Sequence, residues 1–434
     1  MESRKKIMTN VFRQRLPLLT YEIFAFWIYV LGVAMTAFGP IAHYISWFLA
    51  LLSLLYGRIR YGAHLAVEVE PEDRKIIYSL IFFLLWSMFA HIPHIDSFYT
   101  WGKGASIPLE FITGLYLAMR LINTSERRKA FGLTVVAINL VFCFDVMFRP
   151  DFFVLGWNAS LDNGNSVASY SLLLMPFFFC YAFWYFEKNI LLKYLLCLTS
   201  ILLIIFSFSS GGWITAAVQL IIFATYAASS KKINLKSVIV LVVGSLLILS
   251  IIFYVLGKGP VDSMKRELVQ MMSFNNVDVL TTNRKDIWNV SLLMAKVHPV
   301  LGSGWTTFGT VFEKKRNEMA DVLSQSLEKH ISHPHNMCLS IVYSGGIPAL
   351  LFFMIAYVLS IKKSWSGVRD EIDSDEIPWN LICYISLVSI LIYGTNGDVF
   401  EGRRDVSVIF WAVWGLLLVI PGKSQSSHIS DKRA

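Results

Sequence analysis

Charged residues and cysteines are both scarce in this chain. Only 16% of its 434 residues are Asp, Glu, Lys or Arg, whereas 55% are hydrophobic, a balance too apolar for a soluble globular protein and typical of integral membrane proteins. The five cysteines stand singly in or beside apolar runs, with no C-x-x-C spacing, so neither a disulfide framework nor a cysteine-based zinc site is expected. In a membrane protein the net charge of +8 is first of all a signal of topology, because Lys and Arg collect in cytoplasmic loops. Nucleic acid is therefore not an expected partner.

Long apolar runs make up most of the chain. About twelve of them approach the ~20 residues that a bilayer span requires, which predicts an all-α polytopic membrane protein. The expected spans lie near residues 18–36, 40–56, 76–91, 107–121, 131–148, 168–186, 191–208, 212–228, 237–256, 336–360, 379–393 and 406–420.

The basic residues predict how these spans are oriented. Basic clusters precede the first span and follow the second, fourth, eighth and tenth, as GRIR, ERRK, SSKK and IKK. Because Lys and Arg collect in cytoplasmic loops, both termini are expected in the cytoplasm. Residues 1–256 would then hold nine spans, residues 257–335 would form a large periplasmic loop, and residues 336–434 would hold three spans and a cytoplasmic tail.

The long outer loop is too long to be a plain connector and is expected to carry function. The segment RKDIWNVSLLMAKV (284–297) has amphipathic helical periodicity, and a second polar helix is predicted in EKKRNEMADVLSQSLEKH (313–330). The domain division therefore sets a helical outer loop between two groups of membrane helices.

Ionisable groups at the outer membrane face mark where chemistry is expected. They are Arg284, HISHPHN (330–336), NGDVFEGRRD (396–405) and the polar turn FSFSSGGW (206–213). Arg403 and Arg404 stand on the side where arginines are disfavoured. They indicate an anionic ligand, unless they contact lipid headgroups or pair with nearby acids such as Asp398.

The histidines of the second segment allow two interpretations. His330, His333 and His335 resemble part of a metal cluster, but no carboxylate or cysteine stands beside them at a ligand-like spacing, so no metal site is expected. His335 opens a span directly after Pro334. An imidazole at that depth suits proton acceptance from an alcohol in a partly dry site.

Two stretches resemble the O-antigen ligase family. In HNMCLSIVYSGGIPA, His335 and Asn336 are followed by nine residues and then Gly346, which is similar to the family's signature. Upstream, residues 283–308 resemble a segment shared by these ligases and the related O-antigen polymerases, with Arg284, a helix bearing Trp288, and a glycine-rich turn.

The sequence also departs from the family pattern at two places. Ala349 stands where relatives carry Gly, Thr or Tyr, and Ser209 to Gly212 stand where many relatives have an arginine after the seventh span. Lys258 or Arg403 are the possible replacements for that missing cation.

The resemblance implies a GT-C-like glycosyltransferase of the Gram-negative inner membrane whose active site faces the periplasm. It would transfer a glycan from undecaprenyl pyrophosphate to a sugar hydroxyl of lipid A core, by inversion and without a cofactor. His335 would be catalytic, Arg284 and Arg404, with Arg403 as second choice, would bind the pyrophosphate, and the supporting residues would be Asn336, Gly346, Trp288, His333 and Asp398.

Two alternatives stay open at this stage. An O-antigen polymerase would use the same donor with a second lipid-linked glycan as acceptor. A polysaccharide transporter or flippase would carry out no covalent chemistry, and the scarcity of charges deep inside the spans counts against it.

The predicted topology has a direct test. A cysteine introduced at Asn317, in the long outer loop, should react with a membrane-impermeant maleimide in intact spheroplasts. Labelling only after lysis would place the loop in the cytoplasm and contradict the orientation.

Overall fold

The computed structural model describes most of the chain between residues 20 and 420. The described ranges are 20–67, 69–90, 98–147, 164–230, 284–315, 331–372, 374–401 and 403–420, with a few isolated positions between them. All regular elements within these ranges are helices, so the all-α prediction is confirmed for this part of the chain.

After a first helix at Thr20–Ala34, the elements follow the predicted apolar runs closely. They are η1 (Thr36–Phe38), α2 (Pro40–Tyr61), η2 (Pro71–Asp73), α3 (Arg74–Ala90), α4 (Phe98–Leu121), α5 (Ser125–Met147), α7 (Gly164–Cys180), the π-helical turn η4 (Tyr181–Tyr185), α8 (Ile190–Phe206), α9 (Ser210–Ser229), α13 (Arg284–Val297), α14 (Phe308–Lys315), α15 (Met337–Asp370), α16 (Trp379–Gly394) and α17 (Arg404–Leu418). The span predicted at residues 237–256 lies almost wholly outside the described residues.

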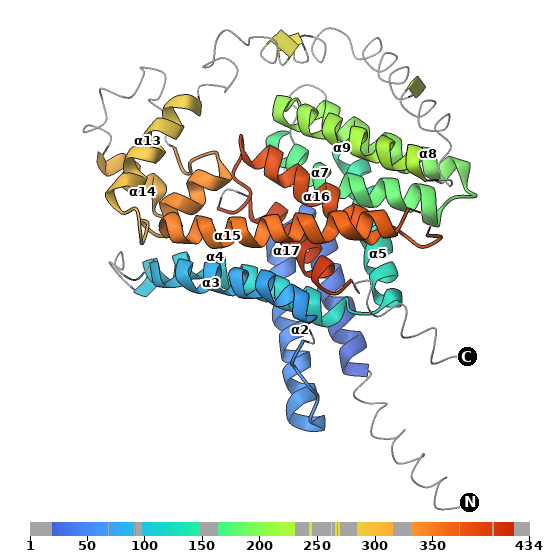
Figure 1. Cartoon of the computed structure of the whole chain (residues 1–434), viewed down its shortest axis with the longest axis horizontal. Coiled ribbons are helices and arrows are strands. Elements are labelled where there is room, and N and C mark those ends of the chain that lie inside the picture. The colour runs from blue at the N-terminus through green and yellow to red at the C-terminus, as the bar shows by residue number, and fades with distance from the viewer. Residues whose placement is uncertain are drawn as a thin grey trace, which may run out of the picture.

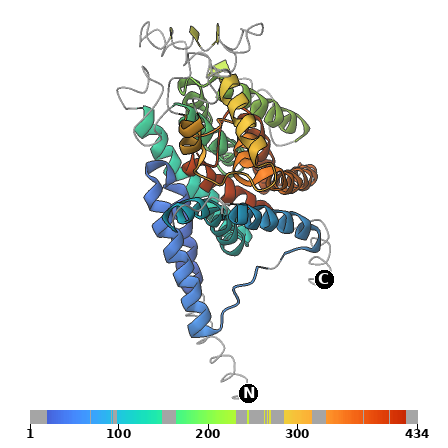
Figure 2. The ribbon, with the colours of Figure 1, turned by 90° about the vertical axis from the view of Figure 1, so that its left-hand side faces the viewer.

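Helix α15 is the axis of the arrangement. It lies beside α3 and α4 in a group of nearly parallel helices (Figure 1), and it packs extensively on both α3 and α16. The first helix and α2 instead extend away from this group in both views (Figure 2). The helices therefore run in more than one direction, and the number of membrane spans stays a prediction.

The interior is built around α7 and α17. From Ser166 to Cys180 every residue of α7 is buried, and α17 buries Trp411 and Trp414 completely. A helix that is apolar on all sides belongs at the centre of a bundle. Helix α17 also packs on α4, and α7 on α8 and α16, so these two helices join the N-terminal and C-terminal halves.

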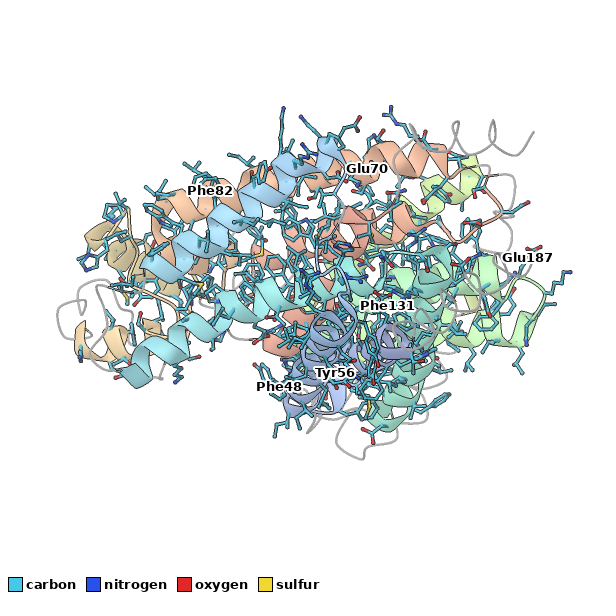
Figure 3. All side chains as sticks on the ribbon, turned by 90° about the horizontal axis from the view of Figure 1, so that it is seen from below. Phe48, Tyr56, Glu70, Phe82, Phe131 and Glu187 are labelled. Atoms are coloured by element: carbon cyan, nitrogen blue, oxygen red, sulfur yellow. The ribbon has the colours of Figure 1, made fainter. Side chains whose placement is uncertain are left out.

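The outer surface of the bundle is also apolar. Phe48 of α2 is 61% exposed and Phe82 of α3 is 58% exposed, and both stand on the outside in Figure 3, whereas Phe131 is fully buried. Four described helices are long and apolar enough to cross a membrane, namely Ser125–Val146, Gly164–Tyr185, Ser210–Ser229 and Met337–Asp370. An apolar exterior of this kind requires lipid, and the chain is a helical membrane protein.

The long loop before α15 contains regular structure, as expected. Helix α13 spans the predicted Arg284–Val297, which confirms that prediction. Of the second predicted helix, 313–330, only the first three residues are described, and they end α14; the remainder lies outside the described residues. The periplasmic position of this loop stays a prediction.

Candidate active site at the start of α15

The residues before α15 are joined to the α16–α17 connection through Asn336. Its side-chain oxygen accepts a hydrogen bond from the Leu339 N–H at 3.0 Å, which caps α15, and its amide donates to the Thr395 carbonyl at 2.8 Å. An N-cap satisfies an otherwise unpaired N–H of the first turn. Asn336 therefore begins the helix and also fixes the preceding histidines against residues 395–403.

His335 has a strained backbone and a free ring nitrogen. Its φ is 54°, a left-handed value that non-glycine residues seldom adopt. Its Nδ1 is buried and has no hydrogen-bond partner among the described residues. The ring packs against that of His333, with the two centroids 4.1 Å apart, while Nδ1 of His333 is 2.8 Å from the Ser332 hydroxyl. Strain of this kind concentrates at functional sites.

Both imidazoles are neutral in this environment. Burial is the largest cause of the low pKa of His335, and the neighbouring His333, Arg284 and Arg403 act in the same direction, so that the pKa falls to about 2. Burial also lowers the pKa of His333, although the carboxylate of Asp398 acts in the opposite direction. A neutral imidazole can accept a proton, whereas an imidazolium cannot.

Arg403 is a buried clamp between helices. Its guanidinium donates to the Asn165 carbonyl, to the Ser169 hydroxyl at 2.9 Å and to the Tyr393 hydroxyl at 2.8 Å, and it lies over the Tyr393 ring at 5.6 Å. The side chain is only 7% exposed. Arg403 thus joins the start of α7 to the end of α16, and its charge reaches the histidines through the interior.

The other predicted charges are arranged differently. Arg284 opens α13 and donates to the Asn396 carbonyl, so the outer helix is tied to the same connection. Arg404 opens α17, and its side chain lies outside the described residues. Asp398 is 1% exposed and accepts from the Ser340 hydroxyl at 2.8 Å and from two backbone N–H groups of its own turn. Its carboxylate therefore stabilises this turn.

Gly346 breaks α15 so that the glycine-rich segment can enter. Its φ of 73° and ψ of −177° interrupt the helix, and a Cβ there would stand 2.1 Å from the Val300 carbonyl oxygen. Gly302 approaches from the other side, where a Cβ would stand 2.6 Å from the backbone of residues 344 and 345. The two glycines allow two backbones to touch.

Backbone groups freed by the break in α15 form hydrogen bonds with other segments. The N–H groups of Ser303 and Gly304 donate to the carbonyls of Tyr343 and Ser344 at 2.6 and 3.0 Å. The Ile347 N–H donates to the Pro299 carbonyl at 2.8 Å, and the Trp86 indole of α3 donates to the Gly345 carbonyl at 2.9 Å. The predicted motif glycine is thus part of the joint between α3, α15 and the outer loop.

Trp288 lies on the helix that covers this joint. Its neighbours on α13, Ile287, Val290 and Met294, form a small buried cluster with Phe308, Phe312, Ile331 and Tyr343. Trp288 itself is partly buried, and its indole N–H has no partner among the described residues. Ile331 belongs to this cluster and so attaches the histidine segment that follows it to α13.

Several residues of the site were not predicted. The backbone carbonyl of Asn165 accepts hydrogen bonds from Arg403 and from the Tyr393 hydroxyl. Its side-chain oxygen accepts one from the Ser209 hydroxyl at 2.8 Å. The only signal was a polar start to an apolar run at residues 164–169. Among the described residues, no group of three or more His, Cys, Asp or Glu is placed to hold a metal; His330 lies outside them, and metal independence stays a prediction.

Comparison with known proteins agrees with the motifs. Residues 195–354 match the family model described as O-antigen ligase. This stretch of the chain is therefore similar to the O-antigen ligase family. The matched range contains Arg284, His335 and Gly346 and ends before Arg403. An O-antigen ligase of Pseudomonas aeruginosa is 28% identical over 139 residues, which cover 32% of this chain and 30% of that protein; the resemblance inferred from the sequence is confirmed.

The glycine joint generates a prediction. Gly346→Ala should destabilise the protein by about 2–4 kcal/mol, because the new Cβ overlaps a backbone carbonyl and the positive φ is strained. To measure stability, the detergent-extracted protein is heated and then passed over a column. The temperature at which half of it no longer elutes as a single species is recorded. Gly102→Ala in α4, where a Cβ would meet nothing within 4 Å, is the control. Equal stability of the two variants would contradict the claim that Gly346 is required for the close backbone contact.

Proposed function

We propose that this chain is an O-antigen ligase, an inverting glycosyltransferase that moves a glycan from undecaprenyl pyrophosphate to a sugar hydroxyl of lipid A core at the periplasmic face of the inner membrane. The observation that carries the proposal is His335. Its imidazole is neutral and has no hydrogen-bond partner at Nδ1 among the described residues, and its backbone is strained. It lies within the electrostatic reach of Arg284 and Arg403, and both His335 and Arg284 fall within the family match.

In the proposed reaction the acceptor hydroxyl oxygen attacks the anomeric carbon of the donor. The bond from that carbon to the pyrophosphate oxygen breaks, and undecaprenyl pyrophosphate leaves with the electron pair. His335 accepts the hydroxyl proton as the new glycosidic bond forms. The energy comes from the diphosphate leaving group, so neither ATP nor a metal ion is required.

Fixed cations would offset the negative charge of the leaving group. Arg284 and Arg404 are the proposed pyrophosphate ligands. Arg404 also stands at the N-terminus of α17, where unpaired N–H groups favour anions. Arg403 already donates to three partners, which supports a role in holding the site together and in contributing charge.

Donor binding would also strengthen His335 as a base. In the empty site the positive charges of Arg284 and Arg403 contribute to the low pKa of its imidazole. A diphosphate bound nearby by Arg284 and Arg404 would offset the effect of these positive charges and raise the pKa of His335. Proton acceptance would therefore be easier when the donor is present.

The alternative acceptor is a second lipid-linked glycan, as in an O-antigen polymerase. Both reactions would use the same proposed donor site. The spacing from His335 and Asn336 to Gly346 favours the ligase. An assay with both acceptors, in EDTA and without ATP, distinguishes the two activities by the product formed.

Substitution of His335 tests the proposal directly. His335→Ala should reduce transfer onto lipid A core by the ~10²–10⁴-fold typical of a positioned general base. The same preparation should still retain labelled undecaprenyl-pyrophosphate glycan, because arginines hold the diphosphate. His333→Ala is the matched control and should lose much less activity. Near wild-type transfer by His335→Ala would remove this residue from the mechanism.

The charge coupling predicts an unusual pH dependence. The pH profile of kcat/KM reports groups in the free enzyme, and that of kcat reports the complex. Since bound diphosphate raises the pKa of His335, the acidic limb of kcat should lie at a higher pH than that of kcat/KM. In Arg284→Gln the kcat/KM limb should move upward, because one cation is lost. Coincident limbs in both proteins would exclude the coupling.

A further inference from the structure

The outer loop carries an exposed apolar turn directly after α13. Val297, Val300 and Leu301 are all exposed, and Val300 is the most exposed of the three at 56%. Residues 297–304 contain no Asp, Glu, Lys or Arg, and their one ionisable side chain is that of His298. In water these apolar side chains would stay hydrated at a cost in free energy. The turn therefore requires a partner that removes it from water.

The turn is joined to the lipid-facing side of α15. The Ile347 N–H donates to the Pro299 carbonyl at 2.8 Å, and Ile347 itself is 50% exposed. Further along α15, Leu351, Ile355 and Val358 are also exposed, and their spacing places all four side chains on one face of the helix. The exposed side chains of the turn therefore continue an apolar surface that already faces lipid.

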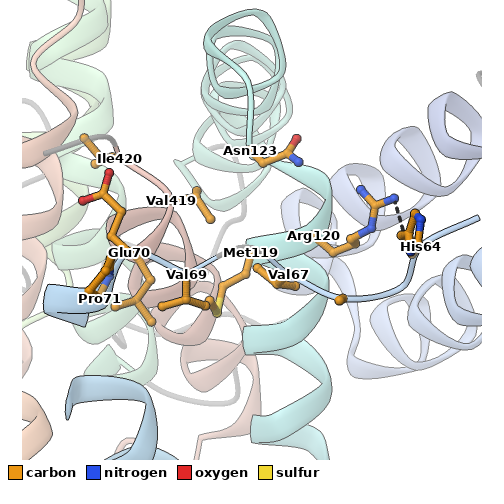
Figure 4. A pocket seen from close by; sticks show the side chains of 12 residues that line it. His64, Val67, Val69, Glu70, Pro71, Met119, Arg120, Asn123, Val419 and Ile420 are labelled. Carbon is orange, nitrogen blue, oxygen red and sulfur yellow. Dashed lines mark hydrogen bonds between the residues drawn. The ribbon is translucent and has the colours of Figure 1, made fainter. Parts of the chain in front are cut away.

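The inner ends of α3 and α15 give a reference level for depth in the membrane. Lys363 of α15 donates to the carboxylate of Asp73, the residue directly before α3. Three residues earlier, Glu70 lines a cavity that Arg120 and Asn123 also border (Figure 4). Charged and amide side chains that gather in this way mark the edge of the hydrocarbon region. Asp73 and Lys363 therefore stand at that edge.

The distance from this edge to the turn is shorter than the membrane is thick. Ile347 stands sixteen residues before Lys363 in α15, or about 24 Å at the α-helical rise. Trp86, which donates to the α15 backbone beside the break, stands thirteen residues after Asp73, or about 20 Å. The hydrocarbon region is ~30 Å thick, and any tilt of the helices makes these depths smaller. Pro299, which is bonded to Ile347, therefore lies within it.

The backbone of the turn is suited to that depth. In hydrocarbon, a non-helical backbone is tolerated only where its polar groups find partners within the protein. The Gly302 N–H donates to the His298 carbonyl at 2.8 Å, and the N–H groups of Ser303 and Gly304 donate to carbonyls of α15. The exposed Lys296 stands just before the turn, where its long basic side chain can reach the headgroups.

We propose that residues 297–301 form a re-entrant turn within the membrane, with Val300 and Leu301 packed against the acyl chains of lipids. The loop that the sequence places outside the membrane would thus return into it at this point. The backbone contact between Gly302 and Gly346 would then lie below the membrane surface. The proposal concerns the placement of this turn and does not depend on glycan transfer.

The test measures which reagents reach a spin label on the turn. The full chain, in proteoliposomes, carries Val300→Cys together with Cys338→Ser, because Cys338 is partly exposed whereas the other four native cysteines are buried. Power saturation compares collisions of the nitroxide with oxygen, which dissolves in lipid, and with a water-soluble nickel chelate. Oxygen should dominate at Val300→Cys and, in a second variant, at Leu301→Cys. The Cys338→Ser protein without an added cysteine gives the background.

Two exposed positions serve as matched references. Leu351→Cys, on the lipid-facing side of α15, should give the same pattern as Val300→Cys. Lys314→Cys, on α14 of the outer loop, should collide several-fold more often with the nickel chelate. Equal access of the chelate to Val300→Cys and Lys314→Cys would place the turn in water and overturn the proposal. Failure of both reagents to reach Val300→Cys would also overturn it, by showing that protein covers the turn.

Discussion

The backbone contact between Gly302 and Gly346 is the constraint on which the rest of the site depends. In an apolar environment a broken helical turn would leave carbonyl groups unpaired at a cost of several kcal/mol each. Here the glycine-rich segment and the Trp86 indole supply the missing donors. The outer loop is therefore part of the helix structure itself, and α13 with Arg284 is held in register with the start of α15.

Two arginines lie close enough to the histidines to act on their charge. Arg284 and Arg403 reach the histidines from different elements, and the nearby carboxylate of Asp398 is occupied by Ser340 and its own turn. Burial keeps the imidazoles neutral, so their charge does not oppose an anionic ligand. Under the proposed function, Arg284 both binds the donor and contributes to the low pKa of His335, so donor binding would favour the proton transfer that follows it.

Local sequence signals predicted the helices well because each apolar run specifies its own element. The segment 284–297 formed the expected helix, and Asn336 has the side chain that a helix start requires. The approach of Gly302 to Gly346 was not predictable, since each glycine alone indicates only a turn. The role of Asn165 was also missed, because it acts through a backbone carbonyl that any residue would supply, and its position depends on the packing of α7 against α16.

The packing of α17 fixes where its first residues stand. Arg403 and Arg404 stand at its N-terminal end, and the buried Leu416 and Leu417 stand near its other end. Between them Trp411 and Trp414 stack with an interplanar angle of 4° and are fully buried. Because close-packed interiors have low compressibility, this packing holds the backbone of Arg403 and Arg404 in one position. Under the proposed function, the placement of Arg404 beside the donor is thus supported by packing and not by charge.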